Sequence, residues 1–331
     1  MQYFIQNLGV PSFEMALVHT GGNYMVDGYG TAASTDLVLE ENPNMTVADV
    51  QAMALEYLGV DNYMLLDDPL GEYIAHIDCW GKFLNVDKVL IAQESANDPR
   101  YNAYEAVANT FANALTPWGN HYQVYRVYAP GNNVRTPYTN SLILNDHVFL
   151  PISGNQYDAG AISAYEEAMP GYTIVPIQQT NNASWQNTDA LHCRTHELAD
   201  LGMLYLKHYP LLGHQVFHES YDLSVTIKAL SGQPLITDSL LAYYRINGGT
   251  WQSVVMQPDS GDVWHATLSG LQADSEVDYY LFAKDASGRR ERLPYIGAAD
   301  PFRFQLGGVG IDETAFAQLA VYPNPTTDRL V

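Results

Sequence analysis

The chain has 331 residues, of which 47% are hydrophobic and 16% are charged. This length is enough to bury a core and corresponds to about two domains at ~150 residues each. Asp and Glu number 37 against 15 Lys and Arg, which gives a formal net charge of -22. A chain this acidic repels a phosphate backbone, so we exclude nucleic acid as a partner. The acidic surface either keeps an exported protein soluble or attracts a cation.

Cys79 and Cys193 are the only cysteines. Two thiols exclude a disulfide-rich scaffold and a four-thiolate zinc site. No apolar run reaches the ~18 residues that span a bilayer. Residues 1–10 lack the basic flank and the apolar stretch of a signal peptide, which predicts either a cytoplasmic protein or a native N-terminus further upstream.

From His19 to about Pro210 the sequence alternates helical and extended segments. The clearest helix covers residues 46–58, where Thr46 caps the first turn and Gly59 ends the last one. Further helices are predicted over 98–115 and 157–169. Short strands are predicted over 88–93, 121–128, 141–144, 148–151 and 172–177. The alternation predicts an α/β domain over residues 1–212.

After Pro210 the helical pattern stops and short alternating strands follow, separated by turns such as Asn247-Gly248-Gly249. The strands are predicted over 223–230, 240–246, 251–256, 264–268, 277–284 and 302–306. Their number and spacing predict an immunoglobulin-like β-sandwich over residues 213–306. Residues 307–331 are predicted to be a linker and a further segment that stops within a strand-like run, so the native C-terminus is expected to lie downstream.

The first candidate for chemistry is an H-x-D pair, His76 and Asp78. If Tyr73 to Asp78 form a strand, both side chains point to the same face and Ile77 packs on the other. A proton-transfer group then stands beside an anion. The competing interpretation is a core histidine that is hydrogen-bonded to a carboxylate.

The second candidate is Cys193, which His192, Arg194 and His196 surround in sequence. Positive neighbours favour the thiolate, the nucleophilic form of cysteine. Two alternatives remain open: a small buried hydrophobic residue, and a zinc site made of His192, Cys193 and His196.

Two shorter patterns contain candidate ligand contacts. Gly21-Gly22-Asn23 allows a tight turn or a close backbone approach to a ligand. Tyr138-Thr139-Asn140-Ser141 places an Asn at the entry of the strand predicted over 141–144. Generic turn chemistry explains either pattern equally well in isolation.

In chain order, these four patterns resemble one family. Gly21-Gly22-Asn23, His76-x-Asp78, Tyr138 to Ser141 and Asn187 to Cys193, followed by a β-sandwich, are similar to the secreted bacterial peptidylarginine deiminases. These enzymes are related to the agmatine deiminases in the guanidino-group-modifying superfamily, so the resemblance implies a pentein-type α/β propeller of five blades. The segment at 322–330, YPNPTTDRL, resembles the start of a type IX secretion sorting domain.

The resemblance implies a role for each matching residue. Cys193 is the nucleophile that forms a covalent thiouronium, and His76 is the proton donor and then the base. Asp78 binds the guanidinium, and Asn140 orients the substrate or the thiolate. Tyr73, Ile74 and Thr188 match pocket-lining positions. The resemblance implies neither a cofactor nor a metal.

It also implies arginine-containing peptides or proteins as substrates, the type IX secretion machinery as a partner, a monomer, and a secreted or cell-surface location. The family has a segment before the Gly-Gly-Asn motif that supplies a second guanidinium-binding Asp and arginines for the substrate carboxylate. Only eighteen residues precede His19, so we expect part of the first blade to be missing and the fragment to be inactive by itself. The alternative functions are an agmatine or free-guanidine deiminase, and a surface binding protein with a relic site.

Overall fold

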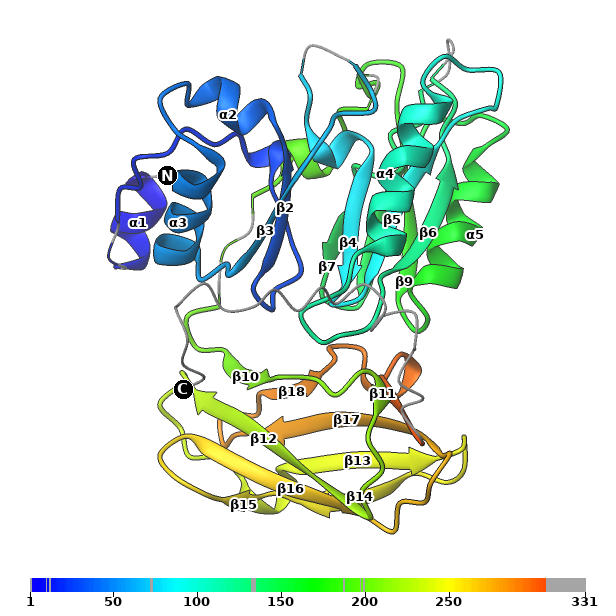
Figure 1. The fold of residues 1–331 in the computed structure, drawn as a ribbon. Coiled ribbons are helices and arrows are strands. Elements are labelled where there is room, and N and C mark those ends of the chain that lie inside the picture. Colours follow the sequence, from blue (N-terminus) through cyan, green and yellow to red (C-terminus); the bar gives the residue numbers. More distant parts are fainter. Residues whose placement is uncertain are drawn as a thin grey trace, which may run out of the picture. The chain divides into compact units, whose positions relative to one another are not determined.

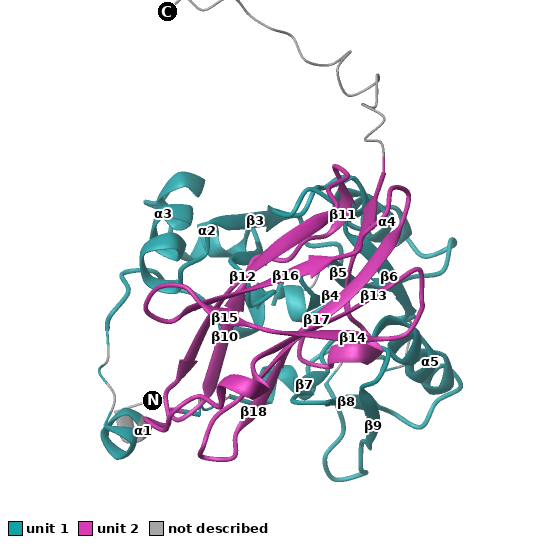
Figure 2. Cartoon of the chain, turned by 90° about the horizontal axis from the view of Figure 1, so that it is seen from below, with its two compact units in different colours: residues 1–200 teal, residues 201–331 magenta. Residues whose placement is uncertain are grey.

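The computed structural model describes residues 2–9, 11, 13–71, 74–131, 135–186, 188–196, 198 and 200–307 (Figure 1). The chain divides into two compact units, residues 1–200 and 201–331 (Figure 2). The boundary predicted after residue 212 differs from this division, because strand β10 (Leu204–His208) pairs with β12 (Ser220–Ala229). The predicted sorting segment lies outside the described residues, apart from Gly307.

The first unit repeats one strand arrangement three times. In each three-stranded sheet the first two strands are antiparallel, and the third is parallel to the second. Module 1 contains β1 (Met25–Val26), β2 (Thr31–Thr35) and β3 (Asn62–Leu66); module 2 contains β4 (Gly81–Asn85), β5 (Lys88–Gln93) and β6 (Gln123–Tyr128); module 3 contains β7 (Leu142–Leu144), β8 (His147–Ile152) and β9 (Thr173–Gln178).

A helical crossover joins the two parallel strands of every module, as parallel pairing requires. The helices, besides α1 (Gln2–Leu8) before module 1, are α2 (Leu37–Glu41) and α3 (Val47–Leu58) in module 1, α4 (Tyr101–Asn113) in module 2 and α5 (Asp158–Ala168) in module 3. In α4, Tyr104, Val107, Ala108 and Phe111 are buried at the spacing of one helix face. This face covers β5 and β6, beside which the helix lies in Figure 1.

The predicted helices and strands of this unit are confirmed to within a few residues at their ends. The Thr46 side chain accepts a hydrogen bond from the Asp49 backbone, and Gly59 ends α3 with a φ of 69°. Strands β1 to β4 and helices α1 and α2 were not predicted, because most are short or lack a clear period. The segment before Asp78 is not a strand, as described below.

The second unit contains two sheets. One has the order β10-β12-β16-β15, and the other has β11-β19-β17-β13-β14 with β18 paired to β17. Alternate residues are buried along β12, namely Leu223, Val225 and Ile227, which gives this strand one core face. The other strands are β11 (Gly213–Gln215), β13 (Leu241–Ile246), β14 (Gln252–Val255), β15 (Gln257–Pro258), β16 (Val263–Ser269), β17 (Glu276–Lys284), β18 (Arg290–Leu293) and β19 (Phe302–Leu306). The described helices include none long and apolar enough to cross a membrane.

Candidate active site

The modules of the first unit bring their entry segments together. Gly21–Asn23 and Ile77–Cys79 form 3-10 turns just before β1 and β4, and Asn140 stands two residues before β7. A third turn, His192–Arg194, follows β9. The first turn contacts both of the others. The repeat therefore delivers one functional segment per module to a common place, although the motifs are far apart in sequence.

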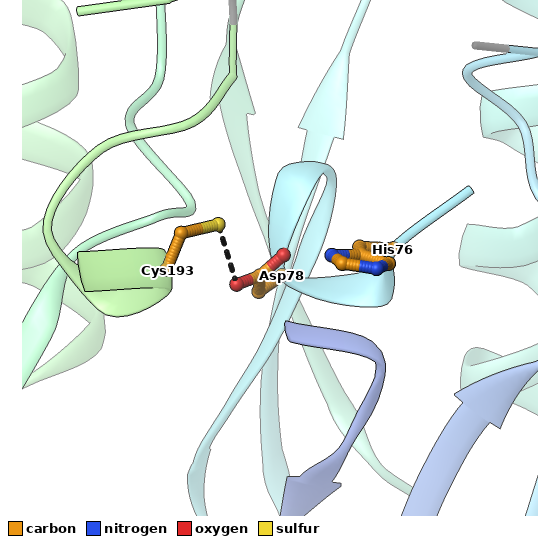
Figure 3. Close-up of side chains that lie close together, drawn as sticks. All are labelled: His76, Asp78 and Cys193. Carbon is orange, nitrogen blue, oxygen red and sulfur yellow. Dashed lines mark hydrogen bonds between the residues drawn. The ribbon is translucent and has the colours of Figure 1, made fainter. Parts of the chain in front are cut away.

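The strand predicted for Tyr73 to Asp78 is wrong. His76 has an extended backbone, and Ile77–Cys79 is a 3-10 turn. Its side chains still reach one place: the ligating atoms of His76, Asp78 and Cys193 all lie within 4.8 Å of one another (Figure 3). Ile77 is fully buried in the core behind them. The H-x-D pattern thus singled out residues that the structure brings together with Cys193, although the secondary structure expected for them was incorrect.

The side-chain amide of Asn140 contacts Cys193 through both its nitrogen and its oxygen. Its Nδ2 donates to Cys193 Sγ at 3.0 Å, and its Oδ1 accepts from the backbone N–H groups of Cys193 at 3.1 Å and Ala190 at 3.0 Å. The backbone oxygen of Asn140 accepts from the N–H groups of Leu191 and His192. Since Asn140 is fully buried, these contacts fix the position of the sulfur.

Asp78 is fully buried and is surrounded by donors. Its Oδ2 accepts from His192 Nδ1 at 2.7 Å and, when Cys193 is a thiol, from its Sγ at 3.2 Å, and its Oδ1 accepts from Cys79 Sγ at 3.6 Å. Burial by itself would raise the pKa of Asp78, but the hydrogen bond and the charge of His192 outweigh it, so the pKa is lowered. Asp78 is therefore an anion at neutral pH.

The groups around Asp78 also shift the pKa values of Cys193 and His76. The pKa of Cys193 is lowered to about 6, chiefly by its interaction with the Cys79 thiol and further by His76 and Asn140, against the effect of burial. Burial lowers the pKa of His76, yet contact with Cys193 and the charge of Asp78 leave it raised overall. At neutral pH the site thus favours a thiolate beside an imidazolium.

This arrangement predicts the reactivity of the thiol. Because only the thiolate attacks, alkylation of Cys193 by iodoacetamide should increase as the pH rises through about 6, and not near the ordinary value for cysteine. The rate on the peptide that contains Cys193, measured by mass spectrometry between pH 4 and 10, gives the profile. A midpoint above pH 8 would contradict the prediction.

Gly22 explains the glycine pair. A Cβ on Gly22 would lie 2.5 Å from His76 Nδ1 and 3.0 Å from Asp78 Oδ2. Asn23 then fastens the turn, because its buried Oδ1 accepts from the backbone N–H groups of Thr35 at 2.9 Å and Ile77 at 3.4 Å. The glycine pair therefore permits a close backbone approach and is more than a generic turn.

A cavity of about 760 Å³ opens onto these groups. Ile74, His76 and Cys193 line it, as do Lys82, Asp189, His192 and Arg194. Of the other predicted pocket residues, Thr188 lines a separate, smaller cavity together with Cys79. Tyr73 lies outside the described residues. The predicted constellation of Cys193, His76, Asp78 and Asn140 is brought together, whereas Thr188 is not in the main cavity.

The zinc alternative named the wrong set of ligands. Among the residues that the structure describes, the three ligating groups that converge are His76, Asp78 and Cys193, without His192 or His196. A soft divalent ion there would occupy the sulfur and the imidazole at once. Metal binding and nucleophilic attack by Cys193 therefore exclude each other.

Comparison with known proteins places the chain among the guanidino-group deiminases. Residues 1–198 match the Porphyromonas-type peptidyl-arginine deiminase family, and the chain belongs to it. Agmatine deiminase of Stutzerimonas stutzeri is 27% identical over 187 residues, which cover 47% of this chain and 51% of the relative. A Vibrio parahaemolyticus protein provisionally named agmatine deiminase is 25% identical over 199 residues, 51% of this chain and 55% of its own. The chain spans about half the length of these curated relatives.

Two solved structures share the fold of the first unit. Agmatine deiminase of Enterococcus faecalis has a TM-score of 0.50 at 24% identity and covers 54% of this chain and 57% of its own. A structure provisionally described as a peptidyl-arginine deiminase has a TM-score of 0.53 at 18% identity and covers 60% of this chain and 64% of its own.

Sequence reasoning missed three contributors to the site. His192 was noted as a positive neighbour of the cysteine and as a ligand of the alternative zinc site, Cys79 only as a thiol, and Lys82 not at all. The adjacency of Cys79 to Asp78 was a usable signal. Lys82 lies in the run Gly81–Asn85, which contains no pattern that distinguishes a buried lysine from a solvated one.

Proposed function

We propose that the protein containing this chain hydrolyses peptidyl-arginine to peptidyl-citrulline and ammonia. The observation that carries the proposal is the convergence of three side chains: the Cys193 thiol and the His76 imidazole line one cavity, and the buried Asp78 carboxylate lies beside them (Figure 3). A guanidinium is a planar cation with a fork of N–H donors, which a buried carboxylate binds well. The family match of residues 1–198 supports this class of substrate.

The proposed reaction proceeds in two halves. The Cys193 thiolate attacks the central guanidinium carbon, and a tetrahedral adduct forms. His76, whose pKa is raised, gives its proton to the departing ammonia and leaves a thiouronium on the sulfur. The neutral imidazole then takes a proton from water, whose oxygen replaces sulfur on the carbon. Citrulline and the thiolate are released.

The second candidate is deimination of agmatine, because two of the relatives compared above are named agmatine deiminases. One assay on protein expressed from the complete reading frame distinguishes the two functions. Internal and C-terminal arginine peptides, agmatine and free arginine are compared by ammonia release and by the mass of the product. Turnover of peptides supports the proposal, turnover of agmatine alone supports the second candidate, and turnover of neither favours a surface binding protein.

Gly22→Ala provides a geometric test of the same site. The new methyl group would displace His76 or Asp78, so we expect turnover to fall on the order of 10²-fold. Gly21→Ala is the matched control, because a Cβ there meets nothing within 4 Å. Initial rates for the two variants decide the matter, and equal rates would show that Gly22 has no steric role.

We further propose that the three modules are blades of a five-bladed pentein propeller and that the two sheets of the second unit form an immunoglobulin-like sandwich.

The segment at 322–330 is the basis for proposing export through the type IX machinery to the cell surface. We also propose that the protein is a monomer. Fractionation of the source cells and the mass of the mature protein test this part.

A further inference from the structure

Lys82 is a buried cation in the wall of the active-site cavity. It lies in β4, opposite Leu90 of β5, and only 7% of its surface is exposed. Among the described residues, its ammonium has no hydrogen bond and no ion pair within contact distance. Burial of an unpartnered charge is costly, so a lysine in this position needs a compensating role.

The anions that act on Lys82 are the two that the reaction uses. Asp78 and the Cys193 thiolate both raise the pKa of Lys82, but burial is stronger and lowers it to about 8. The effect is reciprocal, and Lys82 lowers the pKa of Asp78. On the strand packed beside it, Lys88 donates to the Ala168 carbonyl. The other titratable or charged side chains along the cavity are Tyr24, His76, Asp189, His192, Arg194 and His196.

We propose that Lys82 is a positioning residue. Its ammonium is the cation that keeps Asp78 and Cys193 ionised in the empty site, and it loses its proton when a guanidinium binds. In the empty cavity Lys82 is a buried cation that acts on two anions, Asp78 and Cys193, together with His76 and His192. A guanidinium adds a positive charge beside Asp78. The added charge is offset if Lys82 releases one proton to the solvent, while His76 keeps the proton that the leaving ammonia needs.

The two halves of the proposal differ in what they require. Support of the thiolate by Lys82 concerns the empty site alone and is independent of the reaction. The exchange of Lys82 for a guanidinium rests on the proposed function. The experiment therefore has two parts, of which the first uses no substrate.

In the first part, the pH profile of Cys193 alkylation by iodoacetamide is compared for the parent protein, Lys82→Met and Lys82→Arg. Methionine retains the length of the side chain without its charge, so alkylation at pH 6 should be about tenfold slower and the midpoint should move to higher pH. Arginine retains the charge, and its profile should follow the parent. Circular dichroism and thermal melting confirm that the variants are folded, and Lys82→Gln replaces a Met variant that is not.

A profile of the neutral variant that superimposes on the parent profile would overturn the proposal. A lysine with a merely structural role would lower the melting temperature without moving the profile. Mass spectrometry of the peptide that contains Cys193 distinguishes its alkylation from that of Cys79.

In the second part, agmatine serves as a guanidinium probe that protects Cys193 from alkylation. In the parent protein, the agmatine concentration for half protection should fall about tenfold from pH 7 to pH 9, as Lys82 loses its proton. In Lys82→Met this dependence should vanish. An unchanged dependence would refute the exchange. No protection in any variant would refute the guanidinium site itself, and the first part would still decide the role of Lys82 in the empty site.

Discussion

Replacement of Cys193 by alanine is expected to lower turnover of every guanidinium substrate by at least about 10⁴-fold, because no covalent intermediate can form without the sulfur. The structure leaves no substitute nucleophile in an equivalent place among the described residues, since Cys79 is buried behind Asp78 and lines a different cavity. Ammonia release from the protein expressed from the complete reading frame is the measurement.

Cys79→Ser is the matched control for this variant. It removes the other thiol of the chain but retains a donor near Asp78, so most of the turnover should remain. Because Cys79 lowers the pKa of Cys193, the pH profile of the control is free to shift. Ammonia release by Cys193→Ala near the parent rate would show that Cys193 is not the nucleophile.

Asp78→Asn is expected to weaken binding of an arginine peptide by about 10² to 10⁴-fold, because removal of one partner of a buried ion pair costs about 3–5 kcal/mol. The side chain of Asp78 is fully buried, so solvent cannot replace its charge. Calorimetric titration in a Cys193→Ala background isolates binding from turnover. Asp189→Asn is the control, since this carboxylate lines the cavity, is partly exposed and is paired with Arg194.

The competing role for Asp78 is orientation of a histidine. The structure makes this alternative specific, because Asp78 pairs with His192 and not with His76. If orientation is the only role, Asp78→Asn and His192→Ala should reduce turnover alike while the peptide still binds with parent affinity. Equal affinities with and without the carboxylate would therefore remove Asp78 from guanidinium binding.

The part of the site that could be predicted from sequence is the part encoded by local pattern. The capped helix after Thr46 and the strand Lys88–Gln93 depend on residues a few positions apart, and the structure confirms both. His76, Asp78, Asn140 and Cys193 stood out because uncommon residue types occurred next to turns or strand entries. Their convergence required the resemblance, since no local rule places segments more than fifty residues apart beside one another.

What could not be predicted depends on tertiary burial. The Lys82 side chain is enclosed only because β4 lies between β5 and the turns around the cavity, and its own sequence reads like an ordinary strand. The unit boundary was misplaced for a related reason. Residues 204–208 alternate like many strands, and only their pairing with β12 assigns them to the second unit.

The hydrogen bonds between Asn140 and Cys193 make the reactivity of the thiol depend on the folded state. Fifty-three positions of sequence separate the two residues, so in an unfolded chain Cys193 is an ordinary thiol with no special reactivity at neutral pH. The nucleophile is thus created by tertiary contacts and disappears when they break. Its alkylation at pH 7 would serve as a native-state sensor in a urea titration, and a nascent or misassembled chain would lack the activated thiol.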